Sequence, residues 1–210
     1  MILSALWPQN LFKRTAVLAV LTSLIVAGIV VIPKLVASPQ QANCEWRPAF
    51  EAGLSGLIAK EPPKLVPETA FYDVDDNQIT IADYRGTNVI MNFWATWCAP
   101  CVAEMGALDR LQEQLVGSNI EVLAINEDRD GKAVATAFFE ERGLSHLRIL
   151  MDRDMKLSRA AEVAVMPTTL LINKNGFEVA AVLGEAEWDS PDIVAYLKQC
   201  FSDPETTAAE

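Results

Sequence analysis

The chain has 210 residues, of which 51% are hydrophobic and 21% are charged. This length suits one ordinary domain with short appendages, and the composition lies far from that of a disordered chain. The formal net charge is -11, and residues 38–210 carry 14 basic against 28 acidic side chains. So acidic a chain is a poor partner for nucleic acid or for an anionic lipid surface. A single histidine, His146, also excludes a zinc site built on several histidines.

An uncharged apolar segment lies near the start of the chain, at Thr15–Ile32, directly after Lys13 and Arg14. As a helix, it would nearly match the thickness of the hydrocarbon core of a membrane. Basic residues favour the cytoplasmic side, so we expect residues 1–14 to form a cytoplasmic tail and residues 15–36 a transmembrane anchor. A cleaved secretory signal is the alternative, because the same pattern fits one. Both interpretations place the remaining chain outside the cytoplasm, where disulfides are permitted.

Proline is frequent in the next segment, with five prolines within residues 37–69. We therefore expect residues 37–66 to be a tether, with a short helix in the moderately apolar stretch Ala49–Ala59. The main domain should then span residues 67–201. The polar residues 202–210 are expected to form a disordered acidic tail.

Predicted strands and helices alternate through the main domain. Turn residues at Asp75–Asn77 predict a hairpin over Phe71–Tyr84, and Asn175–Gly176 predicts a second hairpin turn. The other predicted strands are short apolar or alternating runs: Asn88–Trp94, Ile120–Asn126, Leu147–Met151, Thr168–Ile172 and Glu178–Leu183. The predicted helices follow Cys101 for about five turns and then cover Lys132–Gly143, Met155–Val163 and Asp189–Phe201. This order predicts an α/β fold in which helices cover both faces of a mixed sheet.

Two cysteines stand three positions apart where a predicted strand gives way to a helix, in Trp97-Cys98-Ala99-Pro100-Cys101. This spacing suits dithiol redox chemistry, because such a pair can close a small disulfide ring. Free N–H groups at the start of the helix favour a thiolate on Cys98, which we predict to be the attacking sulfur. Cys101 would then resolve the mixed disulfide. The alternative is half of a zinc site, but the chain offers no second cysteine pair of this spacing.

The run NFWATWCAPC at residues 92–101, together with VMPTTLLI at residues 165–172, resembles the thioredoxin superfamily. The likeness is strongest to its membrane-anchored periplasmic branch, the TlpA-like thiol:disulfide interchange proteins. It implies a thioredoxin-like fold over residues 67–201, with an extra strand and helix inserted within Ile120–Met151. It also implies a monomeric enzyme that uses its own redox-active disulfide and needs no prosthetic group and no metal.

The resemblance assigns supporting roles around the cysteine pair. Met166 and Pro167 would form a cis-proline loop that faces the pair, and Trp97 would shield the thiols. Pro100 stands where disulfide-introducing oxidases of the superfamily commonly carry a histidine. It therefore favours a reductase.

Glu104 is the predicted proton acceptor for Cys101. Thioredoxins resemble one another in having a buried aspartate where Asn92 stands here, and an amide cannot take up a proton. Glu104 follows Cys101 by one turn and matches an acidic position of the extracytoplasmic branch. The alternative is an ordinary first-turn glutamate that complements the helix dipole.

Two further cysteines, Cys44 and Cys200, lie outside the motif. If Cys98 and Cys101 pair with each other, only one connectivity remains for the other two. TlpA-like proteins are similar in having a second, structural pair. We therefore expect a Cys44–Cys200 disulfide that ties the tether to the domain, with two free thiols as the alternative.

These observations lead to an expected activity, the reduction of protein disulfides. The enzyme would be a single-pass protein of the bacterial inner membrane with its C-terminal domain in the periplasm. The resemblance implies an electron donor in the membrane, of the DsbD or CcdA type. It also implies substrates with oxidised metal-ligand cysteines, in the copper subunit of cytochrome oxidase or its assembly factor, with apocytochrome c as the alternative. Rival functions are a disulfide-introducing oxidase and a copper metallochaperone. The single histidine disfavours the metallochaperone.

Overall fold

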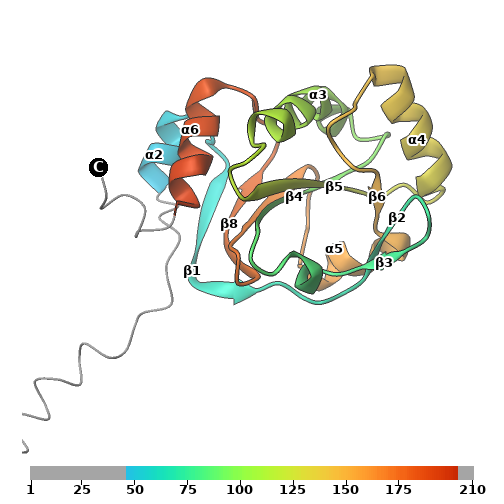
Figure 1. Cartoon of the computed structure of the whole chain (residues 1–210), viewed down its shortest axis with the longest axis horizontal. Helices are drawn as coiled ribbons and strands as arrows, with labels where there is room; N and C mark the ends of the chain where they lie inside the picture. The colour runs from blue at the N-terminus through green and yellow to red at the C-terminus, as the bar shows by residue number, and fades with distance from the viewer. Residues whose placement is uncertain (1–45, 203–210) are drawn as a thin grey trace, which may run out of the picture. The chain divides into compact units, whose positions relative to one another are not determined.

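A mixed sheet of eight strands lies at the centre of the computed structural model, which describes residues 46–202 (Figure 1). Across the sheet the strands follow the order β1-β8-β7-β4-β5-β6-β2-β3. They are β1 (Leu57–Leu65), β2 (Phe71–Asp73), β3 (Gln78–Ile79), β4 (Asn88–Trp94), β5 (Ile120–Asn126), β6 (Leu150–Met151), β7 (Thr168–Ile172) and β8 (Phe177–Leu183).

Helices cover both faces of this sheet. One face packs against α2 (Trp46–Glu51), α3 (Ala99–Gln114), α4 (Gly131–Arg142) and α6 (Pro191–Cys200), which lie above the sheet in Figure 1. The other face packs against α5 (Lys156–Ala160) and the short 3-10 helix η2 (Ile81–Tyr84). The sheet thus separates two hydrophobic cores, and the one under α3 contains the cysteine pair.

The middle of the sheet positions the functional residues. β4 runs parallel to β5, and all seven residues of β4 are buried. Because β4 is covered on both faces, five of its seven residues are apolar, and only Asn88 and Asn92 are polar. On its other side β4 pairs antiparallel with β7, where Asn92 lies opposite Thr169 and Phe93 opposite Thr168. The segment before β7 therefore lies at the end of the sheet where β4 leads into α3.

The predicted α/β fold is confirmed. The bounds of β4, β5 and β7 are those expected from the sequence, and β7 and β8 form the predicted hairpin. The segment Ile120–Met151, in which the resemblance implies an inserted strand and helix, contains β5, α4 and β6, and its being an insertion stays a prediction. Gly143 ends α4 with a φ of 65°, a left-handed conformation that glycine adopts readily.

The predicted tether is wrong in its second half. Leu57–Leu65 forms β1, an edge strand that pairs antiparallel with β8. Pro62 and Pro63 conceal this strand in the sequence, because proline cannot donate a hydrogen bond to its neighbour. The edge position tolerates them, because β1 pairs with a strand on one side only. The register of β1 also shifts between Ala59 and Lys64, around the two prolines.

Other elements differ from the predictions in their bounds. Helix α2 lies earlier than the helix expected at Ala49–Ala59. The turn between β2 and β3 is confirmed, but the second arm of the hairpin is short and continues into η2, where Ile81 and Tyr84 are buried. β6 has only two residues. Helix α5 begins late because the 3-10 helix η3 (Arg153–Met155) precedes it, with Asp154 at a φ of 60°.

The predicted cytoplasmic tail, the membrane anchor and residues 203–210 of the acidic tail lie outside the described residues. Within residues 46–202, no helix is both long enough and apolar enough to span a bilayer. The anchor and the two tails therefore stay predictions.

Candidate active site

The two motif cysteines lie at the start of α3, just after β4. Cys98 is the N-cap residue of α3, Cys101 lies in its first turn, and a disulfide joins them as predicted. Cys98 is 7% exposed, whereas Cys101 is fully buried. A partner therefore reaches the first sulfur more readily, which fits Cys98 as the attacking residue. Pro100 suits the first turn of the helix, where its missing N–H breaks no hydrogen bond.

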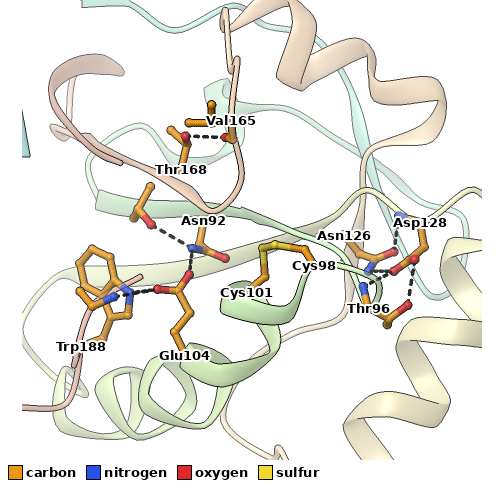
Figure 2. The surroundings of a disulfide bond; sticks show 12 residues. Asn92, Thr96, Cys98, Cys101, Glu104, Asn126, Asp128, Val165, Thr168 and Trp188 are labelled. Carbon is orange, nitrogen blue, oxygen red and sulfur yellow. Dashed lines mark hydrogen bonds between the residues drawn. A yellow bond between two sulfur atoms is a disulfide. The ribbon is translucent and has the colours of Figure 1, made fainter. Parts of the chain in front are cut away.

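Asp128 holds the segment that leads into the cysteine pair (Figure 2). Its Oδ2 accepts hydrogen bonds from Thr96 N at 2.9 Å and from Asn126 Nδ2 at 2.7 Å. Its Oδ1 accepts from Thr96 Oγ1 at 2.9 Å. Asn126 ends β5 beside Trp94 at the end of β4, so the carboxyl ends of two parallel strands bring these groups together. Asp128 is not among the site residues predicted from the sequence, although its place just after a buried strand is a usable signal.

Exposed side chains flank the disulfide. Trp97 is 66% exposed and lines an open groove together with Met155 and Arg159. The Met166–Pro167 peptide bond is cis, as the resemblance implies, and Met166 packs against the core that contains both cysteines. Val165 in the same loop is 53% exposed. Trp97, Met155 and Val165 offer apolar surface to an approaching protein chain.

Glu104 is buried one turn behind Cys101, with only 3% of its surface exposed. It lies beyond the first turn of α3, so the alternative interpretation as a first-turn glutamate is wrong. Residues three positions apart on a helix share a face, so its carboxyl lies on the side of Cys101. Burial raises the pKa of Glu104 to about 7, against the opposing hydrogen bonds from Trp188 and Asn92. Near neutral pH this group can both accept and release a proton.

Neutral donors hold both oxygens of the Glu104 carboxyl (Figure 2). Oε1 accepts a 2.8 Å hydrogen bond from Asn92 Nδ2, which also donates to Thr169 Oγ1 at 2.9 Å. Oε2 accepts from Trp188 Nε1 at 2.7 Å and from Ala186 N at 3.2 Å. Asn92 is recognisable in the sequence, but Trp188 and Thr169 are not. They meet the site only through the fold, since Trp188 is 84 positions from Glu104.

A second buried carboxyl lies near the site, at Glu127 just after β5. It is 5% exposed, and its Oε2 accepts a 3.1 Å hydrogen bond from Ser158 Oγ. Burial, together with the neighbouring carboxylate of Asp152, raises the pKa of Glu127 to about 8. Glu127 is therefore mostly protonated near neutral pH. It lines the groove that Trp97 borders.

Cys200, the last residue of α6, is fully buried. Its predicted partner, Cys44, lies outside the described residues. The structural disulfide between them stays a prediction.

Comparison with known proteins supports a redox role for this site. The model of the Redoxin family matches residues 61–197. Among relatives, the thiol-disulfide oxidoreductase ResA of Bacillus thuringiensis (strain Al Hakam) is 31% identical over 142 residues. That match covers 68% of this chain and 78% of the relative.

Solved structures share the fold of the described domain. A DsbF homologue from Corynebacterium diphtheriae is 25% identical, has a TM-score of 0.56, and covers 67% of this chain and 92% of its own. The pneumococcal exposed lipoprotein thioredoxin of Streptococcus pneumoniae strain TIGR4 is 26% identical, with a TM-score of 0.54 and coverages of 63% and 99%. The thioredoxin-like fold that the resemblance implies is thereby confirmed.

Proposed function

We propose, from the premise that this chain belongs to the Redoxin family and is a thiol-disulfide oxidoreductase, that it reduces disulfides of partner proteins outside the cytoplasm. The observation that carries the proposal is the Cys98–Cys101 disulfide at the start of α3, backed by the buried carboxyl of Glu104. Pro100 between the cysteines, in place of the histidine common in oxidases, favours the reductive direction.

The first step uses the reduced enzyme. The Cys98 thiolate attacks one sulfur of the substrate disulfide, a mixed disulfide forms, and the first substrate thiolate leaves. Backbone N–H groups at the start of α3 and the positive end of the helix dipole stabilise the attacking anion. The position of Cys98 at the N-cap thus favours its thiolate form.

The second step resolves the mixed disulfide. Cys101 gives its proton to ionised Glu104, and the Cys101 thiolate attacks the sulfur of Cys98. The second substrate thiolate leaves, and the Cys98–Cys101 disulfide forms. Two electrons thus pass from the enzyme to the substrate, whose two thiolates take up protons. A Glu104 pKa of about 7 suits this proton transfer at neutral pH.

We place the domain on the periplasmic side of the bacterial inner membrane, held by the anchor predicted at residues 15–36. The similar pneumococcal protein is described as an exposed lipoprotein. In an oxidising compartment a reductase has to be reduced again after each turnover. A membrane protein of the DsbD or CcdA type is the proposed donor of those electrons.

The proposed substrates are oxidised copper-site cysteines of cytochrome oxidase, in its copper subunit or its assembly factor, and apocytochrome c is the alternative. The test compares the rates at which the reduced full-length chain reduces the oxidised copper-binding domain and an apocytochrome c peptide with an oxidised C-x-x-C-H motif. Faster reduction of the copper-binding domain supports the first assignment. Faster reduction of the peptide supports the second.

The reductive direction is tested by the equilibrium redox potential of the Cys98/Cys101 pair in the full-length chain. We expect a value near the roughly -270 mV of thioredoxin or below. A value of about -120 mV, typical of strong periplasmic oxidants, would make the enzyme an oxidase of substrate thiols instead.

A further inference from the structure

Trp188 contacts the redox site from a distant part of the chain. It lies on the loop between β8 and α6, and its side chain is fully buried. Its indole Nε1 donates a 2.7 Å hydrogen bond to Glu104 Oε2, and Ala186 N of the same loop donates to that oxygen at 3.2 Å. The β8–α6 loop therefore donates hydrogen bonds to one oxygen of the Glu104 carboxyl, and Asn92 of β4 donates to the other (Figure 2).

A second tryptophan, Trp94, provides an internal comparison. It is also fully buried, but its Nε1 has no hydrogen-bond partner among the described residues. Trp94 is held by aromatic packing, with ring centroids 5.0 Å from Phe138 and 6.0 Å from Phe139. Loss of the indole N–H therefore removes a hydrogen bond at Trp188 and removes none at Trp94.

Glu104 also borders an open groove between α3 and the β8–α6 loop. Ala103, Ala186 and Glu187 line this groove, and neither Cys98 nor Cys101 does. A proton on the Glu104 carboxyl thus has a way to solvent that is separate from the disulfide. The loop that carries Trp188 forms one wall of that groove.

We propose that Trp188 is a positioning residue of the redox site, whose indole N–H fixes the Glu104 carboxyl in the orientation that accepts the proton of Cys101. A neutral donor to a carboxylate stabilises its ionised form, which is the form that takes up the proton. This inference rests on the proposed function, because it acts on the step in which Cys101 resolves the mixed disulfide.

The test compares Trp188→Phe and Trp94→Phe with the wild-type full-length chain. Each reduced protein reacts with bis(2-hydroxyethyl) disulfide, and acid quench with mass spectrometry follows the decay of the mixed disulfide on Cys98 between about pH 5 and pH 9. In Trp188→Phe the midpoint of the pH profile should move upward by about one pH unit, because the carboxylate loses a donor. In Trp94→Phe the midpoint should stay where it is in the wild type.

An unchanged midpoint in Trp188→Phe, or an equal shift in Trp94→Phe, would overturn the inference. If Trp188→Phe does not fold, the indole N–H resonances of the ¹⁵N-labelled wild-type protein decide instead. The Trp188 resonance should titrate with the midpoint of the kinetic profile while that of Trp94 does not, and a flat Trp188 titration contradicts the proposal. Failure of the wild-type protein to form any mixed disulfide on Cys98 would instead refute the proposed function itself.

Discussion

The proton-acceptor role proposed for Glu104 depends on the surroundings of its carboxyl. An exposed glutamate is ionised at neutral pH, and its low pKa makes it a poor acceptor for the proton of a thiol. Here burial raises the pKa to about 7, and three neutral donors keep the group from becoming permanently protonated. The balance between burial and hydrogen bonding leaves a base that is available near neutral pH.

Replacement of Glu104 by glutamine should slow the resolving step at neutral pH by about a hundredfold, because glutamine keeps the shape but accepts no proton. The attack by Cys98 on a small disulfide should change little. Quenched-flow measurement of both steps separates the two effects. Glu113→Gln, at an exposed position of the same helix, is the matched control and should leave both rates unchanged. Equal slowing of both steps in Glu104→Gln would refute the assigned role.

The buried Glu127 predicts a pH dependence of stability. Folding raises its pKa from 4.5 to about 8, so in this window the folded chain holds a proton that the unfolded chain has lost. The free energy of unfolding should therefore fall as pH rises through the window, by up to about 1.4 kcal/mol per pH unit from this group. Glu127→Gln should flatten that slope, as measured by urea unfolding of the oxidised protein at several pH values.

Glu104→Gln offers a comparison in the same unfolding experiment. The pKa of Glu104 in the folded protein is about 7, so the contribution of Glu104 to the pH dependence of stability should end about one pH unit below that of Glu127. A Glu127→Gln profile that runs parallel to the wild type through the window would show that Glu127 is not protonated in the folded protein.

At the scale of elements, apolar patterning predicts the buried strands well and polar contacts poorly. β4, β5 and β7 are recognisable because strands covered on both faces have largely apolar sequences. β1 is not, since Pro62 and Pro63 are compatible with a strand only at the edge of a sheet, and edge positions are not visible in one sequence. The cysteine motif and Glu104 are close together in the sequence and are predictable from it. Asp128 is marked only by its place after a buried strand, and Trp188 meets Glu104 only through the fold.

Asp128, which follows β5, should stabilise the segment that leads into the cysteine pair. Asp128→Ala leaves the backbone N–H of Thr96 without its partner, so the protein should lose about 1 to 3 kcal/mol of stability. The Thr96 amide should also exchange its hydrogen faster. Urea unfolding and hydrogen exchange measure the two effects. Asp130→Ala is the control, because this exposed aspartate makes no capping hydrogen bond, and a loss of stability equal to that of Asp128→Ala would contradict the prediction.

At the scale of the whole molecule, the acidic surface should influence which disulfides the enzyme meets. Residues 38–210 carry twice as many acidic as basic side chains, and the grooves beside the site contain acidic residues such as Asp154 and Glu187. A charge of this sign attracts cations and repels anions over about 10 Å at ordinary ionic strength. The effect belongs to encounter rather than to chemistry, so added salt should remove it.

Three small disulfides of different charge test this effect. At low salt the reduced enzyme should react several-fold faster with dicationic cystamine than with uncharged bis(2-hydroxyethyl) disulfide, and more slowly with anionic oxidised glutathione. Added salt should lower the first rate, leave the second unchanged and raise the third, because screening weakens attraction and repulsion alike. Stopped-flow measurement of the attack by Cys98 gives all three dependences. A common salt dependence for the three compounds would show that the acidic surface lies too far from Cys98 to act on its partners.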